Sequence, residues 1–414
     1  MKFYLRMVFL ATVLLYTALA KLSFGVPVRT LLSSYLFVLL LFAYRREFLD
    51  TVKSHQLTVL VFAGLTVTGG LVTILNGRGL DVVIGHALSD LIQPFLILVC
   101  TLVLSRLAGV GFVARVFVGS ALLTGAVALL QFADVGTAWR LRDWLGVIQA
   151  EPADLLTADE KIRPMGVSLT PIVYSYHIAS AYILLNLLHR LGRVSGSAYA
   201  VLVLSMLAMA VANGTRSLVL GILAQEALFS IMRMRLQSLL WIGVLAIAGM
   251  AGLALLEAIG SRVATLSDTS AASRVVLYIY GLRLAADHPF GLGWGFQPGD
   301  LAWLYWEHLS GFINSDGVFR LGIHNAFLNF FLTFGLFGVA VIAFAIYVKP
   351  RKFGILAMCS TAYIVNTLLH NDGLFVGDSY YWFAFAVFVH LYQPGWSAIR
   401  TRAAPRASPH PIHP

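Results

Sequence analysis

Charged residues are scarce in this sequence. Asp, Glu, Lys and Arg make up 12% of its 414 residues, whereas 59% of the residues are hydrophobic. Soluble domains carry about 25% charged residues, so the composition excludes an ordinary soluble protein. Apolar runs of roughly 15 to 22 residues recur along the chain, which is typical of transmembrane helices.

Cysteine is almost absent. The two cysteines, Cys100 and Cys359, lie inside apolar runs and have no Cys-x-x-Cys or Cys/His spacing, so they indicate neither a disulfide framework nor a metal site. Acidic residues are too scattered for a carboxylate metal site. The glycine-rich "GLGWG" at 291–295 follows no predicted strand and is therefore not a dinucleotide loop. We expect no metal and no cofactor.

The apolar runs predict an all-α polytopic membrane protein, because open strands would leave backbone groups unsatisfied in lipid. The run 197–232 is too long for one crossing, and Asn213-Gly214 supplies a turn that divides it. Residues 1–395 form one integral membrane domain, and the tail 396–414 is expected to be disordered and cytoplasmic. About twelve helices are predicted, at 3–20, 28–44, 57–75, 84–104, 112–132, 169–188, 197–212, 217–232, 237–257, 324–348, 353–369 and 379–393.

Basic residues gather at alternate ends of these helices and fix the predicted orientation. Cytoplasmic loops carry an excess of Lys and Arg, so both termini are predicted to be cytoplasmic. These loops explain the net charge of +10, which therefore does not indicate nucleic-acid binding. Two long loops, about 133–168 and about 258–323, then face outward, the second between helices 9 and 10. The cytoplasmic basic residues are Arg45, Arg46, Arg106, Arg190, Arg193, Arg233, Arg235, Lys349, Arg351, Lys352, Arg400, Arg402 and Arg406.

The larger outer loop contains "SRVVLYIYGLRLAADHPFGLGWGF", residues 273–296. This pattern predicts a helix that is ended by Pro289 and a glycine turn. The aromatic residues Trp294, Trp303, Tyr305 and Trp306 are expected at the membrane–water interface, where such side chains are enriched.

Arginines on the outer side are exceptions to the positive-inside pattern. Arg216 starts a short helix directly after a turn. A charge at membrane depth indicates a function, unless the side chain snorkels to lipid headgroups.

Arg274 lies in the predicted loop helix, with Tyr278 one turn on and Arg283 beyond. Guanidinium groups bind phosphates in a bidentate manner, so these arginines are candidates for binding a lipid-attached pyrophosphate. The alternative is that each arginine pairs with a loop carboxylate, such as Asp268 or Asp287.

His324 and Asn325 stand at the head of the apolar run "RLGIHNAFLNFFLTFGLFG", residues 320–338. Imidazole is the commonest general base at neutral pH. His324 could equally cap the helix or bond a loop carbonyl. Asn325 could orient the ring or bind a sugar hydroxyl.

The motifs resemble those of the bacterial O-antigen ligases, within the wider O-antigen ligase and polymerase superfamily. Members are polytopic and carry a large periplasmic loop near the C-terminal third. The family pattern of His followed by Asn, Ser or Gln, nine residues and then GxxG is matched by His324-Asn325 and by Gly335 to Gly338.

Two further motifs carry the resemblance. The family has a motif at a short periplasmic loop in which arginine is followed by three residues and then leucine. Arg216 and Leu220 match this motif. Arg274 resembles the arginine of the family's large loop by its place before "PFGLGWG". The related polymerases often contain a repeat in which arginine is followed by ten residues and then glycine. This repeat is absent here, and its absence favours a ligase.

The resemblance implies a GT-C-like glycosyltransferase of the bacterial inner membrane with its active site facing the periplasm. The donor would be a glycan on undecaprenyl pyrophosphate and the acceptor a hydroxyl of lipid A–core, with no metal and with inversion. Arg216 and Arg274 would bind pyrophosphate and His324 would act on the acceptor. Arg163, Arg283, Asn325 and Asp372 are accessory candidates.

Two alternatives stay open. A polymerase would join repeat units on the same lipid carrier. A polysaccharide transporter or flippase would be expected to show two related halves and helices broken at the midplane, whereas the unusual polar residues here lie in outer loops.

Overall fold

The computed structural model describes residues 2–17, 28–144, 163–168, 170–233, 269–312, 314–370 and 380–391, together with positions 243, 373 and 375. Every element in these ranges is helical, which confirms the all-α prediction. The elements are α1 (Lys2–Thr17), α2 (Val28–Ala43), α3 (Arg45–Ser54), α4 (Gln56–Leu75), α5 (Leu80–His86), η1 (Ala87–Ile92), α6 (Gln93–Leu104), η2 (Ser105–Gly109), α7 (Val110–Phe132), α8 (Gly136–Trp144), α10 (Pro171–Arg190), α11 (Gly196–Asn213), α12 (Arg216–Arg233), α14 (Thr269–Asp287), η3 (Pro298–Leu301), α15 (Ala302–Leu309), η4 (Ser315–Phe319), α16 (Ala326–Val348), α17 (Pro350–Cys359), α18 (Thr361–Leu368) and α19 (Tyr380–Leu391).

Five helical runs are long and apolar enough to cross a membrane: Gln56–Leu75, Leu80–Phe132, Pro171–Arg190, Gly196–Asn213 and Ala326–Val348. The run Leu80–Phe132 is longer than one crossing, and it bends at Gly109, whose φ of 90° ends the π-turn η2. The chain is therefore a multi-pass membrane protein. Helices lie at every predicted segment except 237–257, of which the structure describes position 243 alone. The number of crossings and the side of each terminus stay predictions.

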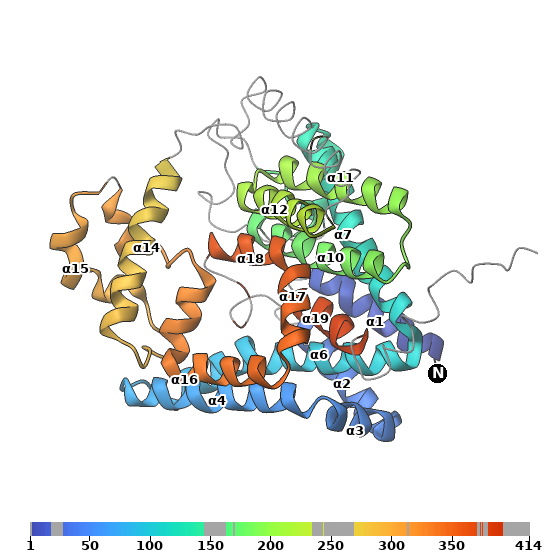
Figure 1. The fold of residues 1–414 in the computed structure, drawn as a ribbon, viewed down its shortest axis with the longest axis horizontal. Coiled ribbons are helices and arrows are strands. Elements are labelled where there is room, and N and C mark those ends of the chain that lie inside the picture. The colour runs from blue at the N-terminus through green and yellow to red at the C-terminus, as the bar shows by residue number, and fades with distance from the viewer. Residues whose placement is uncertain are drawn as a thin grey trace, which may run out of the picture.

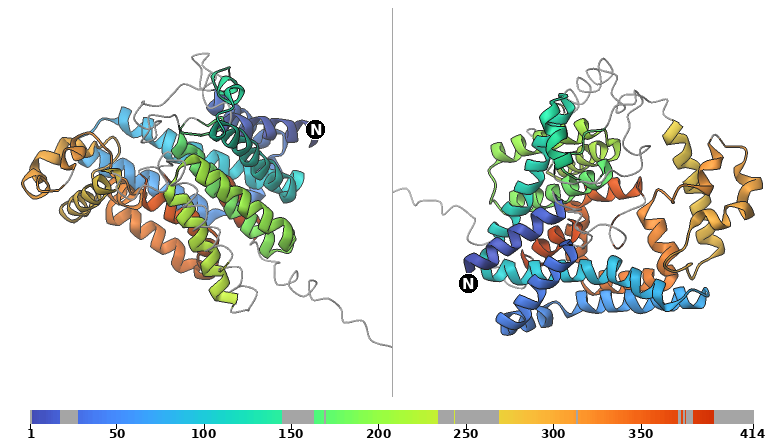
Figure 2. Two further views of the ribbon diagram at one scale, coloured as in Figure 1. Left: turned by 90° about the horizontal axis from the view of Figure 1, so that it is seen from above. Right: turned by 180° about the vertical axis from the view of Figure 1, so that it is seen from behind.

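The helices form a bundle with an outer group at one end (Figures 1 and 2). Helix α4 packs along α16 at the lower edge of Figure 1, while α10, α11 and α12 lie in the upper part with α7. Between them, α18 packs on α12, and α19 packs on both α6 and α10. The outer group consists of α14, α15 and η4, at the left of Figure 1.

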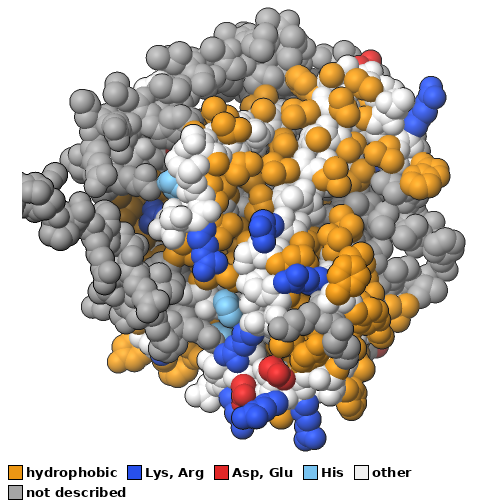
Figure 3. Space-filling model, turned by 90° about the vertical axis from the view of Figure 1, so that its right-hand side faces the viewer, with side chains coloured by type: hydrophobic (Ala, Val, Ile, Leu, Met, Phe, Trp, Pro, Cys, Tyr) orange, Lys and Arg blue, Asp and Glu red, His pale blue; other side chains and the backbone are white. Residues whose placement is uncertain are grey.

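Basic side chains gather at the end opposite this outer group. Arg106 donates to Ser54 Oγ at the end of α3, and both Arg106 and Arg193 lie near His390. Figure 3 looks onto this end and shows Lys and Arg side chains spread among apolar ones, with few acidic groups. Arg106 and Arg193 therefore lie near one another, and the predicted alternation of the basic loops stays a prediction.

Differences from the sequence-based segments include the region of α17 and α18 and helix α3. The predicted helix 353–369 is divided at Ser360, where the backbone turns with φ −101° and ψ 8°, so that α17 and α18 have different directions. Helix α3 was not predicted, because "RREFLDTVKS" is too polar to be recognised as a span.

Candidate functional site

His324 lies just before the first turn of α16. Its Nδ1 is 2.8 Å from the carbonyl oxygen of Gly322. A carbonyl oxygen only accepts hydrogen bonds, so Nδ1 carries the hydrogen and the lone pair of the neutral ring is on Nε2. A ring held in this tautomer can take a proton at Nε2.

Asn325 is the N-cap of α16. Its Oδ1 accepts hydrogen bonds from the backbone N–H groups of Phe327 at 2.9 Å and Leu328 at 3.0 Å. Its side chain also forms a hydrogen bond with Tyr278. The side chain thus fixes the start of the helix behind His324, as Asn commonly does at this position. A direct role toward substrate stays a prediction.

Helix α14 presents Arg274, Tyr278 and Gly281 on one face, because residues four and seven apart lie within about 40° of one another around an α-helix. The helix approaches the chain before α16 at Gly281, where an added Cβ would lie 2.9 Å from Ile323 Cγ2. Ile323 directly precedes His324. This close approach therefore brings Arg274 and Tyr278 to the start of α16.

Tyr278 is half-buried at this contact. Burial raises the pKa of its hydroxyl, while the hydrogen bond with Asn325 and the positive charge of Arg274 act in the opposite direction. Tyr278 thus links the loop arginine to the cap of α16.

Arg283 has a different position. It follows Arg274 by nine residues, which places it about 180° around the helix. Its side chain is exposed and lies near Tyr305, whose hydroxyl donates to Asp287 Oδ2 at 2.7 Å. Arg283 therefore faces α15 and not the start of α16. Its predicted accessory role stays a prediction.

Arg163 crosses the turn that precedes α12. Its Nη2 donates to the carbonyl oxygen of Asn213 at 3.2 Å and lies 3.3 Å from Thr215 Oγ1. Asn213 in turn donates to the carbonyl of Pro164 at 2.8 Å. Arg216 follows as the first residue of α12. Two candidate arginines, far apart in the sequence, thus meet at one turn.

Gln131, at the end of α7, holds the loop that carries Arg163. Its Oε1 accepts from the backbone N–H groups of Met165 at 3.0 Å and Gly166 at 2.9 Å, and its Nε2 donates to the carbonyl of Gly166 at 2.9 Å. Gly166 has φ +60°, and an added Cβ would lie 2.3 Å from the carbonyl oxygen of Thr124. Only glycine fits this close approach of the loop to α7.

His370 follows α18 and has 4% of its surface exposed. Its Nε2 is 3.0 Å from Ser217 Oγ in the first turn of α12. Burial lowers the pKa of His370 well below its usual range, and electrostatic interactions with Arg274, His324 and Arg163 lower it further. Because all three groups act on one ring, they lie within electrostatic range of the same point.

We call Arg163, Arg274 and His324, gathered around His370, the cationic site; Arg216 precedes the Ser217 that contacts His370. The sequence predicted its arginines and His324 but missed His370, Ser217 and Gln131. These three are isolated polar residues at helix ends, and no local pattern distinguishes them. Asp372 lies outside the described residues.

The glycine motif interrupts α16. Gly335 has φ 61° and ψ −162°, and an added Cβ would lie 2.2 Å from the carbonyl carbon of Phe290. The loop after α14 is bonded to this break, because Leu336 N–H donates to the carbonyl of Pro289 at 2.9 Å and Leu292 N–H to that of Leu332 at 2.5 Å.

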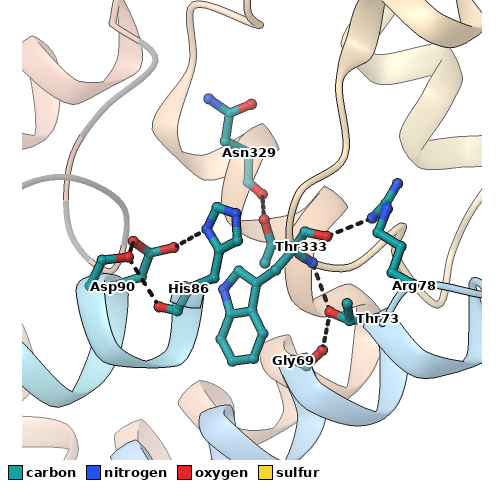
Figure 4. Close-up of polar contacts among 9 residues, drawn as sticks. Gly69, Thr73, Arg78, His86, Asp90, Asn329 and Thr333 are labelled. Atoms are coloured by element: carbon teal, nitrogen blue, oxygen red, sulfur yellow. Dashed lines mark hydrogen bonds and ion pairs between the residues drawn. The ribbon is translucent and has the colours of Figure 1, made fainter. Parts of the chain in front are cut away.

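The same loop is bonded to the end of α4. Arg78 Nη1 donates to the carbonyl oxygens of Leu292 and Trp294, both at 2.7 Å, and Trp294 N–H donates to Thr73 Oγ1 at 2.8 Å. Figure 4 shows Arg78 and Thr73 with their hydrogen bonds. Trp294 is buried, 2% exposed, and packs against Gly69 of α4. The predicted interfacial position is therefore wrong for Trp294, because its ring fills the contact between the loop and α4.

An apolar groove of about 690 Å³ runs between α4, α16, α17, α18 and α19. Its wall includes Phe327, three residues after His324, and it extends to Lys53 and Lys349. Aromatic side chains dominate the interior, among them Phe330, Phe375, Tyr381, Trp382 and Phe385.

Residues 200–343 match the protein family described as O-antigen ligase. The resemblance to the O-antigen ligase and polymerase superfamily is confirmed. No curated protein matches the chain.

The family match runs from α11 into α16 and contains Arg216, Arg274, His324 and Asn325. Arg163 and His370 lie outside it, so the structure extends the candidate site beyond the matched segment. Members of the superfamily are glycosyltransferase-like enzymes, either ligases or polymerases.

Proposed function

We propose that the chain is an O-antigen ligase that transfers a glycan from undecaprenyl pyrophosphate to a hydroxyl of lipid A–core. The observation that carries this proposal is the position of His324. Its Nδ1–H is held by the Gly322 carbonyl, and its ring lies in a cationic site with Arg163 and Arg274. A proton acceptor beside cations is the arrangement that displacement of a pyrophosphate needs.

The reaction would be a single displacement at the anomeric carbon. The acceptor hydroxyl oxygen forms a bond to that carbon, and its proton passes to Nε2 of His324. The bond between the carbon and the pyrophosphate oxygen breaks, and the pyrophosphate leaves on its lipid. Attack opposite the leaving group inverts the anomeric centre.

The arginines would carry the electrostatic part of the reaction. Arg274 and Arg216 would bind the pyrophosphate, and Arg163 would add a further contact. Cations that are already in place stabilise the negative charge that develops on the leaving group. Pyrophosphate is a good leaving group, so positioning and charge neutralisation are the main tasks of the protein, and we expect no metal requirement.

The apolar groove supports a lipid-linked donor. It begins at Phe327, next to the cationic site, and its wall is aromatic and aliphatic. A polyprenyl chain could lie in this groove while its pyrophosphate meets the arginines, because apolar surface is buried favourably by such a chain. We place the reaction at the periplasmic face of the inner membrane.

The test is a deletion strain complemented with wild-type protein or with His324→Ala, read by gel electrophoresis of lipopolysaccharide. We expect the wild type to restore capped lipopolysaccharide and His324→Ala to leave uncapped core. Normal capping by His324→Ala would contradict the proposed role of His324.

The same strain separates a ligase from a polymerase, which the family match leaves open. If the deletion strain accumulates long chains on the lipid carrier, the protein is a ligase. If it accumulates single repeat units, the protein is a polymerase and the proposal is wrong. Purified protein in a chelating buffer would test the expected independence from metal.

A further inference from the structure

A series of buried hydrogen bonds leads from α10 to His370. Ser175 Oγ donates to the carbonyl oxygen of Ile172 at 2.7 Å, and Asn366 Nδ2 donates to Ser175 Oγ at 3.1 Å. Ser217 Oγ donates to Asn366 Oδ1 at 2.7 Å and lies 3.0 Å from His370 Nε2. The series connects α10, α18 and α12 through side chains that are buried.

This series determines which nitrogen of His370 carries the hydrogen. The Ile172 carbonyl can only accept, so Ser175 uses its hydrogen there and can only accept from the Asn366 amide. Asn366 Oδ1 must then accept from Ser217, whose oxygen is left to accept from His370. The hydrogen of the neutral ring is therefore on Nε2, and Nδ1 carries a lone pair.

Nδ1 of His370 is buried and has no hydrogen-bond partner among the residues that the structure describes. An unsatisfied buried acceptor costs free energy, so it marks a place where a donor is expected in another state of the protein. Phosphate oxygens at neutral pH only accept hydrogen bonds, so a bound phosphate cannot donate one to Nδ1 of His370. Among the described residues, the guanidinium groups of Arg163 and Arg274 are donors within electrostatic range of this ring.

We propose that His370 is a positioning residue of the cationic site, whose Nδ1 accepts a hydrogen bond from a guanidinium group when a pyrophosphate is bound. The inference rests on the proposed function. An arginine held from behind by a neutral acceptor keeps its remaining N–H groups aimed at the phosphates. Burial and the surrounding cations keep the ring neutral, because they lower the pKa of His370.

His177, elsewhere in the protein, provides a matched control for His370. This residue is also buried, its Nε2 lies 3.2 Å from Ser120 Oγ, and its Nδ1 has no hydrogen-bond partner in the described part of the chain. Its ring is stacked on Tyr380, with the centroids 4.9 Å apart, and not gathered with arginines. Substitution of His177 removes the same groups from the same kind of environment but away from the cationic site.

The experiment measures the affinity of the full-length detergent-solubilised protein for undecaprenyl pyrophosphate. We expect His370→Phe to weaken binding about tenfold, which corresponds to about 1.4 kcal/mol at 25 °C. His370→Gln should stay within about threefold of the wild type, because an amide supplies both a donor for Ser217 and an acceptor. His177→Phe should bind as the wild type does.

Transfer kinetics give a second readout. Loss of a positioning group should raise the KM for the lipid donor more than it lowers kcat. Should His370→Phe fold poorly, Ser217→Ala breaks the same series of hydrogen bonds with a smaller change and should weaken binding several-fold.

The possible results separate the two proposals. Wild-type protein that does not bind the lipid would refute the proposed donor, and the inference would fall with it. Wild-type binding together with unchanged affinity in His370→Phe and Ser217→Ala would overturn the inference alone. Equal losses in His370→Phe and His177→Phe would also overturn it, because the effect would then be general loss of packing.

Discussion

Gly335 in the middle of α16 is in direct backbone contact with Phe290, in the loop after α14. An added Cβ on Gly335 would lie 2.2 Å from both the carbonyl carbon and the carbonyl oxygen of Phe290. The second glycine of the motif, Gly338, would place a Cβ 2.2 Å from Phe334 Cβ. The GxxG pattern thus has a physical meaning here, because it lets the outer loop reach into an interrupted helix.

Gly335→Ala should therefore destabilise the protein. The φ of 61° with ψ −162° is essentially restricted to glycine, and forcing another residue there costs about 1–3 kcal/mol before the clash with Phe290 is counted. Thermal unfolding in detergent should show a clear decrease in Tm and a loss of transfer activity. Gly119→Ala in α7, where a Cβ meets nothing within 4 Å, is the control and should unfold like the wild type. A wild-type Tm for Gly335→Ala would refute the contact.

His324→Ala should lower kcat by roughly 10²–10⁴, the range expected for loss of a general base. Binding of the lipid donor should change little, because the proposed role of His324 is toward the acceptor. The measurement is transfer by purified protein from a lipid-linked donor. His308→Ala, an exposed histidine in α15, is the control and should keep full activity. Equal rates for the two variants would exclude His324 as the base.

The two arginines of α14 should behave differently. Arg274→Ala should weaken donor binding by about ten- to a hundredfold, as expected for a lost charge-assisted contact of about 1.5–3 kcal/mol. Arg283→Ala should stay within about threefold of the wild type, because Arg283 faces α15. The KM for the lipid donor is the measurement. If Arg283→Ala weakened donor binding more than Arg274→Ala, the assignment of the two helix faces would be wrong.

Asn325 should tolerate a change that preserves the helix cap. Asn325→Asp keeps an oxygen that accepts from the N–H groups of Phe327 and Leu328, whereas Asn325→Ala loses both bonds and should cost about 0.5–2 kcal/mol. We expect Asn325→Asp to unfold close to the wild-type Tm and Asn325→Ala to unfold earlier. Activity that is lost equally in both variants, without a change in Tm, would instead indicate a direct contact of the amide with substrate.

Filling the groove should affect long lipid donors selectively. Ala357 lines the groove, and Ala357→Trp would occupy part of its volume of about 690 Å³. The KM should rise for a donor with a full undecaprenyl chain and change little for a short prenyl analogue. Leu123→Trp, on an exposed part of α7 outside the groove wall, is the control. Equal effects of Ala357→Trp on the KM of both donors would show that the prenyl chain binds outside the groove.

Much of the fold was predictable from local patterns. The turn at Asn213-Gly214 was predicted from its residue types, and Gly214 has φ 72° there. The helix before Pro289 was predicted from its apolar pattern and from proline as a stop, and α14 ends at Asp287. Such signals depend on residues that are neighbours in the sequence.

Contacts between distant segments were not predictable in the same way. The break in α16 at Gly335 is invisible in an apolar run, because a glycine there also fits an unbroken helix. His370 joins the site only because α18 packs on α12, and it stands 153 residues from its partner Ser217. The burial of Trp294 depends on α4, which precedes it by more than 200 residues.

The bonds of Arg78 and Thr73 to the loop after α14 have a consequence for motion. They join the outer helices to the end of α4, while Gly335 joins the same loop to α16. A lid that swings away from the bundle would have to break all of these bonds together. We therefore expect α4, α14 and α16 to move as one rigid body. Two bulky lipid-anchored substrates would then gain entry by displacement of the opposite wall, formed by α12 and α18, which can be measured by distance labels placed across the site.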